Sequence, residues 1–246
     1  MTTIGWIEAD WPAPEHIRAG STTRQGGISK SSYAGLNLAL HVDDNASAVR
    51  QNRRLLLESL GLPSEPQWLE QVHGSDVATD EQPWRCADAI QTTQPGHVCA
   101  VMTADCLPVL FCDMAGTTVA AAHAGWRGLA AGVLLETLKT LPADNNQLMA
   151  WFGPAIGPRV FEVGQEVRAA FIKQSNEFSA AFTVVDEQHW LMDIYQTARI
   201  QLAMQGVERV YGGEFCTYEQ AALFYSYRRE QQTGRMASLI WMEPGA

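Results

Sequence analysis

Short apolar runs separated by turns are the feature of this sequence that most limits its fold. Four of them follow one another, at residues 87–93, 97–103, 107–113 and 117–123, with Pro-Gly and Ala-Gly pairs among the turns. Apolar runs of this length, bounded by turn residues, are typical of buried strands. We therefore expect a sheet whose strands are covered on both faces.

Helical patterns lie before and after these strands. A helix is predicted over residues 43–61, where Asn45 and Ser47 can cap the start and Gly61 ends it. A second helix is predicted from Trp126 to Pro142, and further helices near 164–174 and 193–205. Strands are predicted at 147–152, 208–211 and 236–242. The alternation predicts an α/β fold, a mixed sheet with helices on its faces.

Length and composition indicate one folded unit. The chain has 246 residues, no internal repeat and no Ser/Gly linker, so we expect a single domain spanning residues 1–246. Its 46% hydrophobic and 18% charged residues are typical of a globular protein. A core of this size needs neither disulfides nor a structural metal. Any metal bound here is therefore expected to be functional.

Charge and cysteine usage exclude several classes of protein. The formal net charge is −10, which repels a nucleic-acid backbone. Glu8 and Asp10 stand where a signal peptide has its basic and apolar regions, and no apolar run reaches the ~18 residues of a membrane span. We therefore expect a cytoplasmic protein with no nucleic-acid or membrane partner. Five cysteines without CxxC spacing predict free thiols.

Two histidines and one cysteine occupy positions that favour chemistry. His73 ends a predicted strand before Gly74, and His123 ends another before the glycine-flanked turn AGWRG. Cys106 lies beside Asp105 in TADCLP, between two buried strands. Turns that follow strand ends are where site residues collect. The other histidines have no titratable partner at an informative spacing and are assigned no role: His16, His41, His97 and His189.

Two arrangements of His73, Cys106 and His123 are chemically competent. Two imidazoles and a thiolate are a common catalytic zinc set that leaves a fourth position for water or substrate. Alternatively, a Cys106 thiolate activated by His123 can act as a nucleophile, with a backbone amide as oxyanion donor. The gaps of 33 and 17 residues fit no local zinc pattern. Spacing alone therefore leaves both arrangements open.

Arginines provide candidate anion-binding groups. Arg127 lies at the predicted start of a helix, where a guanidinium and free amides can hold a phosphate together. Arg24, in the glycine-rich turn TTRQGGIS, is a second candidate. Three arginines near the C-terminal end are expected to be solvated surface residues: Arg228, Arg229 and Arg235.

The motifs, in their order along the chain, resemble a known family. The sequence is similar to the YfiH family in TTRQGGIS, LNLALHVDD, QVHGSDV, ADAIQTTQPG, ADCLPVLFCD, HAGWRG, GPAIGP and FYSYRRE with TGR. Members of that family carry the labels laccase-domain protein, multicopper polyphenol oxidase and purine nucleoside phosphorylase. The similarity covers almost the whole chain, and ADC followed by HAGWRG is its most specific part. It implies a three-layer α/β/α sandwich.

The resemblance also implies zinc and purine chemistry. By resemblance, His73, Cys106 and His123 are the catalytic residues and the zinc ligands. The implied activities are phosphorolysis of adenosine, inosine, guanosine and methylthioadenosine, together with deamination of adenosine. The partners are then small-molecule nucleosides and phosphate.

Roles for other residues follow from that chemistry as hypotheses. Arg127 and Arg24 would position the phosphate against the sugar carbon. Asp105 and Glu162 are candidates for the group that protonates the leaving base.

Two alternative functions stay open. A conventional multicopper oxidase needs many imidazoles, typically in His-x-His pairs, and this chain has six histidines and no such pair. Copper in place of zinc can still support slight phenol oxidation as a side activity, because copper outranks zinc in affinity for most N/S sites. Related bacterial proteins are also described as peptidoglycan editing factors, which suits a Cys/His hydrolase acting on a serine-bearing precursor.

Overall fold

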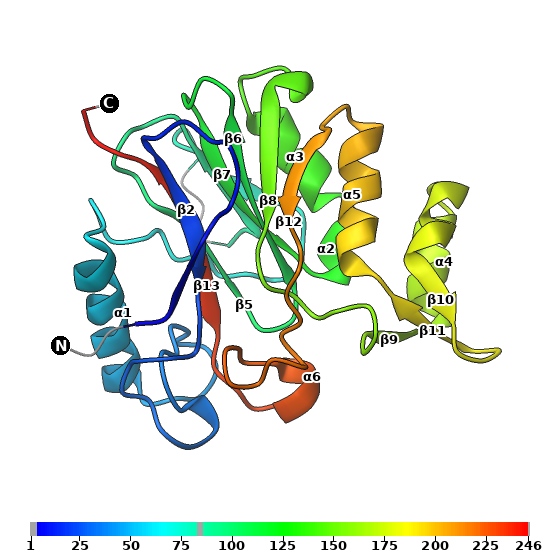
Figure 1. Cartoon of the computed structure of the whole chain (residues 1–246), viewed down its shortest axis with the longest axis horizontal. Coiled ribbons are helices and arrows are strands. Elements are labelled where there is room, and N and C mark those ends of the chain that lie inside the picture. The colour runs from blue at the N-terminus through cyan, green and yellow to red at the C-terminus, as the bar shows by residue number, and fades with distance from the viewer. Residues whose placement is uncertain (1–3, 83–85, 246) are drawn as a thin grey trace.

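Two stacked β-sheets form the centre of the molecule, and helices cover their outer faces (Figure 1). The computed structural model describes residues 4–82 and 86–245. The N-terminal segment is expected not to be a signal peptide, and its residues 1–3 lie outside the described residues. No helix in the described part of the chain is long and apolar enough to cross a membrane.

The larger sheet has six strands in the order β12-β8-β6-β7-β4-β3. Its central strands β8, β6, β7 and β4 run antiparallel, whereas the outer pairs β12/β8 and β3/β4 are parallel. The sheet is therefore mixed, as predicted. The strands are β3 (Val77–Ala78), β4 (Ala89–Thr92), β6 (Leu107–Asp113), β7 (Val119–Ala124), β8 (Leu148–Phe152) and β12 (Arg209–Gly212).

The smaller sheet has the order β1-β2-β13-β5 and is antiparallel throughout. It packs on the larger sheet through a buried cluster to which β2, β5 and β13 contribute together with β4, β6, β7 and β8. The central β layer is therefore two sheets thick. The strands are β1 (Trp6–Glu8), β2 (Ile17–Thr22), β5 (Cys99–Thr103) and β13 (Met236–Met242).

Helices bury the two outer faces. Helix α1 (Ala46–Leu60) covers the smaller sheet, and Asn45 caps it by accepting from the amides of Ser47 and Ala48. On the larger sheet lie α2 (Trp126–Ala131), α3 (Val133–Thr140) and α5 (Ile194–Met204). The continuous helix predicted for residues 126–142 is wrong in one respect. It breaks at Gly132, whose φ of 91° ends α2.

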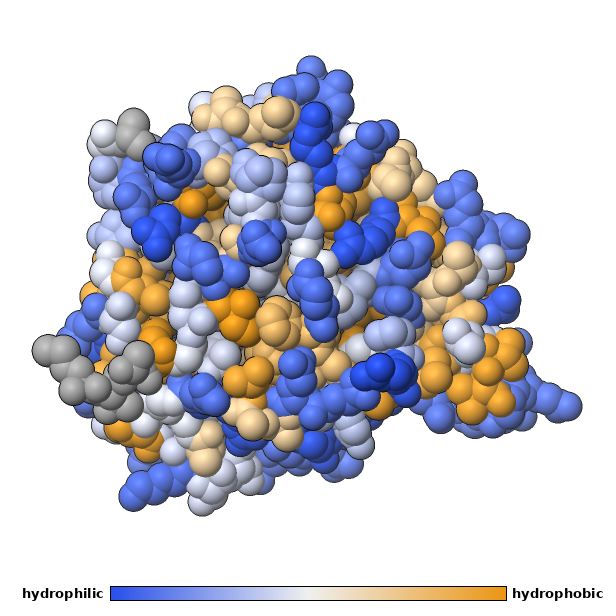
Figure 2. Space-filling view, viewed as in Figure 1, coloured by the Kyte–Doolittle hydropathy of each residue, from blue (hydrophilic) through white to orange (hydrophobic). Residues whose placement is uncertain are grey.

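A small lobe protrudes beside α5 (Figure 1). It contains a three-stranded antiparallel sheet of β9 (Glu162–Gly164), β10 (Phe182–Val184) and β11 (His189–Met192), with α4 (Gln165–Ile172) packed against it. Figure 2 shows hydrophobic residues at the surface of this lobe, where Val184 and Val185 are exposed. The remaining elements are α6 (Tyr227–Glu230) and the short helices η1 (Ser31–Tyr33), η2 (Asn145–Gln147) and η3 (Asn176–Ala181).

These layers confirm the expected α/β sandwich with a mixed sheet, and its central β layer consists of two stacked sheets where the resemblance implies a single layer. Nearly all strands of the larger sheet are buried on both faces, which is why they appear in the sequence as continuous apolar runs. All five cysteines are free, as predicted.

Candidate metal centre

Three separate segments bring His73, Cys106 and His123 together. Cys106 lies in the turn between β5 and β6, and His123 lies on β7 opposite Pro108 in the paired strand β6. His73 approaches from the loop before β3. One ligand atom from each residue lies within 4.8 Å of the others, and Cys106 Sγ is 3.8 Å from His73 Nε2. The fold therefore assembles the three residues that the motifs predict.

The donor set suits a tetrahedral metal with one open position. Zinc–nitrogen and zinc–sulfur distances of about 2.0–2.3 Å place tetrahedral donors about 3.5 Å apart, close to the spacing observed. His123 is buried, Cys106 is partly exposed and His73 is exposed. A metal held by these donors would thus face solvent on one side. Gly125 makes room for them, since a Cβ there would lie 2.9 Å from Cys106 Sγ and 3.1 Å from His73 Cδ2.

Asp88 fixes both histidines. Asp88 is buried and directly precedes β4. Its carboxylate accepts hydrogen bonds from the amides of Val72, His73 and Gly74, at 3.1, 2.9 and 2.6 Å. It also accepts from Nδ1 of His123 at 2.8 Å, which turns Nε2 toward the other donors. His73 has a φ of 61°, in the left-handed region that a residue with a side chain seldom adopts. The three hydrogen bonds from this segment to Asp88 hold the backbone in that conformation. Such a carboxylate is the usual outer partner of a metal-binding imidazole.

The electrostatics of the site favour a thiolate. Burial raises the pKa of the Cys106 thiol, but the charge of His123 and hydrogen bonds from His123 and His73 outweigh it and lower the pKa to about 6. Burial lowers the pKa of His123, whereas the Cys106 charge and the hydrogen bond to Asp88 raise it to about 9. A deprotonated sulfur is what either a metal or a nucleophilic reaction requires.

The site opens onto a cavity of about 530 Å³. Its walls combine apolar and cationic side chains from both sheets, α2, α6 and the segment before β9. The lining residues outside the three donors include His41, Gln71, Asp105, Trp126, Arg127, Ile156, Phe161, Ile194, Tyr227, Arg228 and Arg235. A cavity of this size and lining can hold a small organic molecule.

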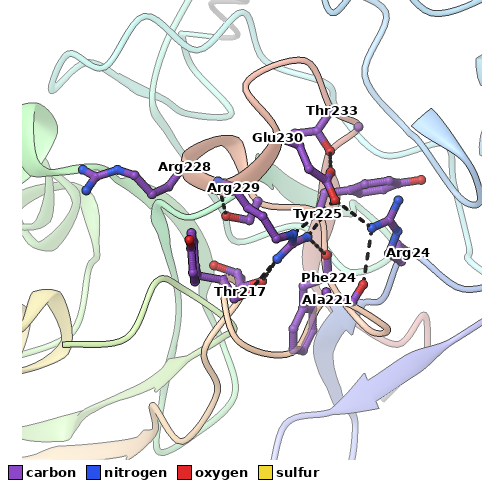
Figure 3. A network of polar contacts seen from close by, with 12 residues as sticks. Arg24, Thr217, Ala221, Phe224, Tyr225, Arg228, Arg229, Glu230 and Thr233 are labelled. Carbon is purple, nitrogen blue, oxygen red and sulfur yellow. Dashed lines mark hydrogen bonds and ion pairs between the residues drawn. The ribbon is translucent and has the colours of Figure 1, made fainter. Parts of the chain in front are cut away.

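The predicted anion-binding arginines are placed differently. Arg127 lines the cavity at the first turn of α2, exposed and lying over the Trp126 ring at 4.5 Å. Arg24 is not among the lining residues. Its guanidinium pairs with Glu230 at 3.3 Å and lies over Tyr225 (Figure 3). The structure therefore brings Arg127 to the site and leaves Arg24 in a separate network.

The expectation that the C-terminal arginines are solvated is wrong for two of them. Arg229 donates to the carbonyls of Thr217, Tyr218 and Phe224 and pairs with Glu230 (Figure 3). These carbonyls belong to loops without strand partners, and the guanidinium satisfies them. Arg235 is half-buried in the cavity wall. Arg228 is exposed, as expected, and points away from this network (Figure 3).

The two candidate proton donors also differ in position. Asp105 lines the cavity, and its carboxylate accepts from Thr217 Oγ1, Ser226 Oγ and the Arg228 amide. Glu162 is exposed on β9 and is not among the lining residues.

The sequence analysis did not single out Asp88, and it assigned no site role to His41 and Arg235, which line the cavity. A signal for Asp88 exists, because an acid inside an apolar run such as ADAIQTT must be hydrogen-bonded if it is buried. His41 lies in a segment without regular structure, and the sequence carries no comparable signal for it.

Comparison with known proteins identifies the family of this chain. The family model described as multi-copper polyphenol oxidoreductase laccase matches residues 18–243. A purine nucleoside phosphorylase of Pseudomonas aeruginosa is 52% identical over 241 residues, which cover 97% of this chain and 98% of that protein. The purine nucleoside phosphorylase YfiH of Escherichia coli is 54% identical over 239 residues, covering 96% and 98%.

A solved structure matches equally well. The crystal structure of a Neisseria meningitidis protein of family DUF152 superimposes with a TM-score of 0.94 at 47% identity, covering 97% of this chain and 99% of that one. The names of the relatives support an enzymatic role. The chain belongs to the multi-copper polyphenol oxidoreductase laccase family, the YfiH family that its motifs resemble.

Proposed function

We propose that this protein is a purine nucleoside phosphorylase that works at a zinc centre held by His73, Cys106 and His123. The observation that carries the proposal is that this donor set opens directly onto a cavity lined by aromatic rings and arginines. A nucleoside and phosphate need those two kinds of surface. The names of the relatives point to the same reaction.

The chain's own residues divide the work. Trp126, Phe161 and Ile156 provide apolar surface for a purine base. Arg127 orients phosphate toward the sugar carbon, because it lines the same cavity. Zinc held by His73, Cys106 and His123 would supply Lewis acidity. Asp105 is the better placed of the two candidates for protonating the leaving base, since it lines the cavity and Glu162 does not.

The proposed substrates are adenosine, inosine, guanosine and methylthioadenosine. Deamination of adenosine is proposed for the same cavity: water attacks the amino-bearing carbon of the adenine ring and ammonia leaves, so the reacting atom is on the base and not on the sugar. Residues 1–246 would act as one cytoplasmic domain, and copper in place of zinc would give phenol oxidation only as a side activity.

Metal analysis and product analysis together test the proposal. Protein purified without added metal should hold about one zinc per chain, and His73→Ala, Cys106→Ala and His123→Ala should each lose it while remaining folded. Incubation with inosine and phosphate should release hypoxanthine and ribose 1-phosphate. Full zinc occupancy in Cys106→Ala, or nucleoside binding without ribose 1-phosphate, would contradict it.

The role of Arg127 is tested by comparing two reactions of one variant. Arg127→Ala should slow phosphorolysis by about 2–4 kcal/mol of transition-state stabilisation and leave adenosine deamination much less affected, because only phosphorolysis uses a bound oxyanion as nucleophile. Equal losses in both reactions would instead assign Arg127 to the nucleoside or to local structure.

One observation favours a second candidate function, a cysteine hydrolase acting on a peptidoglycan precursor. Asp88, His123 and Cys106 form a chain in which the carboxylate orients the imidazole beside the sulfur. This is the geometry of an activated nucleophile and its base. Activity that survives chelation, with a substrate-linked thioester at Cys106 in a mass spectrum, would establish the hydrolase and exclude the zinc enzyme.

A further inference from the structure

Three arginines of the cavity share one arrangement. Each lies over an aromatic ring that also lines the cavity: Arg127 over Trp126 at 4.5 Å, Arg228 over Phe161 at 5.4 Å and Arg235 over Tyr227 at 5.9 Å. None of the three forms an ion pair with a carboxylate of the described residues. The chain as a whole carries a net charge of −10. Cations without acidic partners are therefore concentrated where a ligand would bind.

Arg235 differs from the other two because it is half-buried and two hydrogen bonds hold its guanidinium, whereas the exposed Arg228 donates one, to the carbonyl of Glu162 at 3.0 Å, and Arg127 donates none among the described residues. The Nη1 of Arg235 donates to the carbonyls of Thr233 and Gly234, at 2.9 and 3.0 Å. Its backbone amide donates to Asn37 Oδ1 at 3.0 Å, just before β13 begins. Within the described chain, Nε and Nη2 of Arg235 donate no hydrogen bond. The side of the guanidinium that these two nitrogens form is thus available to a ligand.

That side has a defined chemical preference. Two parallel N–H groups on one edge of a guanidinium match two oxygens of a phosphate or carboxylate. The edge is prepared in advance, because the protein fixes Nη1 and half-buries the side chain. The guanidinium belongs to a residue that lines the same cavity as the three donors.

We infer that the Nε–Nη2 edge of Arg235 is the preformed binding site of the phosphate co-substrate. The inference rests on the proposed function and identifies the residue that sets its phosphate affinity. Arg127 is exposed and makes no hydrogen bond with the described residues, so it is free to move onto a phosphate that Arg235 already holds. A fixed donor gives more affinity than a mobile one, because less side-chain entropy is lost on binding.

The nearby carboxylate does not compete for this edge. Asp105 forms no ion pair with Arg235, and its oxygens accept from Thr217, Ser226 and the Arg228 amide instead. It therefore leaves Arg235 available while holding the segment that carries Tyr227 at the cavity.

Two variants of Arg235 and one matched control test the inference. Arg235→Lys keeps the charge and removes the planar edge, and Arg235→Gln removes both. Arg199→Lys is the control, because Arg199 is also half-buried, donates to the carbonyls of Val210 and Gly212 and lies over Phe152, but does not line the cavity. Each zinc-loaded protein is titrated calorimetrically with inorganic phosphate, and KM is measured for phosphate and for inosine.

The expected result is selective. Phosphate binding should weaken about 10- to 100-fold in both Arg235 variants, KM for phosphate should rise in parallel, and KM for inosine should change by less than about twofold. Arg199→Lys should match the wild type in all three values. Thermal unfolding identifies any variant that fails to fold. If Arg235→Gln fails to fold, the result for Arg235→Lys decides the test.

The two proposals fail in different ways. Phosphate binding that depends on Arg235, in a protein that shows no phosphorolysis, would support the phosphate-binding role of Arg235 and reject the proposed function. Phosphorolysis with an unchanged KM for phosphate in Arg235→Lys and Arg235→Gln would overturn the phosphate-binding role of Arg235 and leave the proposed function standing.

Discussion

At the scale of single residues, the carboxylate of Asp88 is completely buried and accepts four hydrogen bonds. Three come from the backbone around His73 and one from the imidazole of His123. These donors, and the positive charge on His123, lower the pKa of Asp88 even though burial raises it. One side chain therefore positions two of the three proposed metal ligands.

Asp88→Asn should weaken zinc binding about 10- to 100-fold, as loss of an outer-shell partner typically does. Asparagine keeps one acceptor oxygen and places an NH₂ group where the other stood, so it loses the hydrogen bonds made to one oxygen: those from the Val72 and Gly74 amides, or those from the His73 amide and the His123 ring. Competition with a zinc chelator measures the change. Asp113→Asn is the matched control, since Asp113 is also buried and accepts from Thr117 and Thr118 but lies away from the cavity. Equal zinc affinity in Asp88→Asn and wild type would contradict the positioning role.

An added methyl group should reduce zinc binding at one of the two glycines beside the ligands and leave zinc binding unchanged at the other. At Gly125 a Cβ would lie 2.9 Å from Cys106 Sγ, whereas at Gly74 the nearest atom is 3.5 Å away, an ordinary contact. Gly125→Ala should therefore displace the sulfur, reduce zinc occupancy and lower stability by about 1–3 kcal/mol. Gly74→Ala should retain zinc. Metal analysis of the two purified proteins compares them directly, and full occupancy in Gly125→Ala would show that the ligands tolerate the crowding.

The thiol of Cys106 offers a test based on pH. Because its pKa is lowered to about 6, the metal-free protein holds a thiolate above that pH and a thiol below it. Iodoacetamide should therefore alkylate Cys106 rapidly at pH 7 after chelation, and the rate should fall as the pH drops through about 6. With zinc bound the reaction should be slow at either pH, since the sulfur is committed to the metal. Rapid alkylation of the zinc-loaded protein at pH 7 would favour the nucleophile over the ligand.

At the scale of secondary-structure elements, strong local patterns were sufficient for prediction. Helix α1 has an Asn45 cap and a Gly61 stop, and the structure confirms both. Strands β5, β6 and β7 are buried on both faces, so their apolar runs are continuous. The motifs HGS, ADC and HAG likewise identified three residues that the fold brings together.

Other elements depend on contacts that are distant in sequence. Strands β9, β10 and β11 are three or four residues long and mostly only partly buried, so they have no periodic apolar pattern to detect. Arg235 acquires its position from the neighbouring turn and from Asn37, nearly 200 residues away in the chain. Such roles arise from tertiary packing, and local sequence carries no trace of them.

The break between α2 and α3 allows a prediction at this scale. Gly132 has a φ of 91°, and a Cβ there would meet no atom closer than 4.0 Å, so the cost of a side chain is the backbone conformation alone. Gly132→Ala should destabilise the protein by about 1–2 kcal/mol and leave zinc content unchanged. Urea unfolding measures the loss. An increase in stability would mean that the two helices can join into one.

At the scale of the whole molecule, three buried clusters lie between successive layers. The first joins the larger sheet to its helices, the second joins the two sheets, and the third joins the smaller sheet to α1. None of them depends on the donor set for its packing. His73, Cys106 and His123 come from three segments at one end of these layers, so a metal bridges parts of a core that is already closed.

Metal removal should therefore lower stability without unfolding the protein. Zinc that binds only the folded state adds RT ln(1 + [Zn]/Kd) to its free energy of unfolding, about 4 kcal/mol at a free concentration 1,000 times Kd. After chelation, the far-UV circular dichroism at 25 °C should be unchanged and the thermal midpoint should fall. The midpoint of Cys106→Ser, which lacks a ligand, should respond little to either zinc or chelator. Loss of the circular dichroism signal on chelation would show that the metal closes the core, and would assign the donor set a structural role in place of a catalytic one.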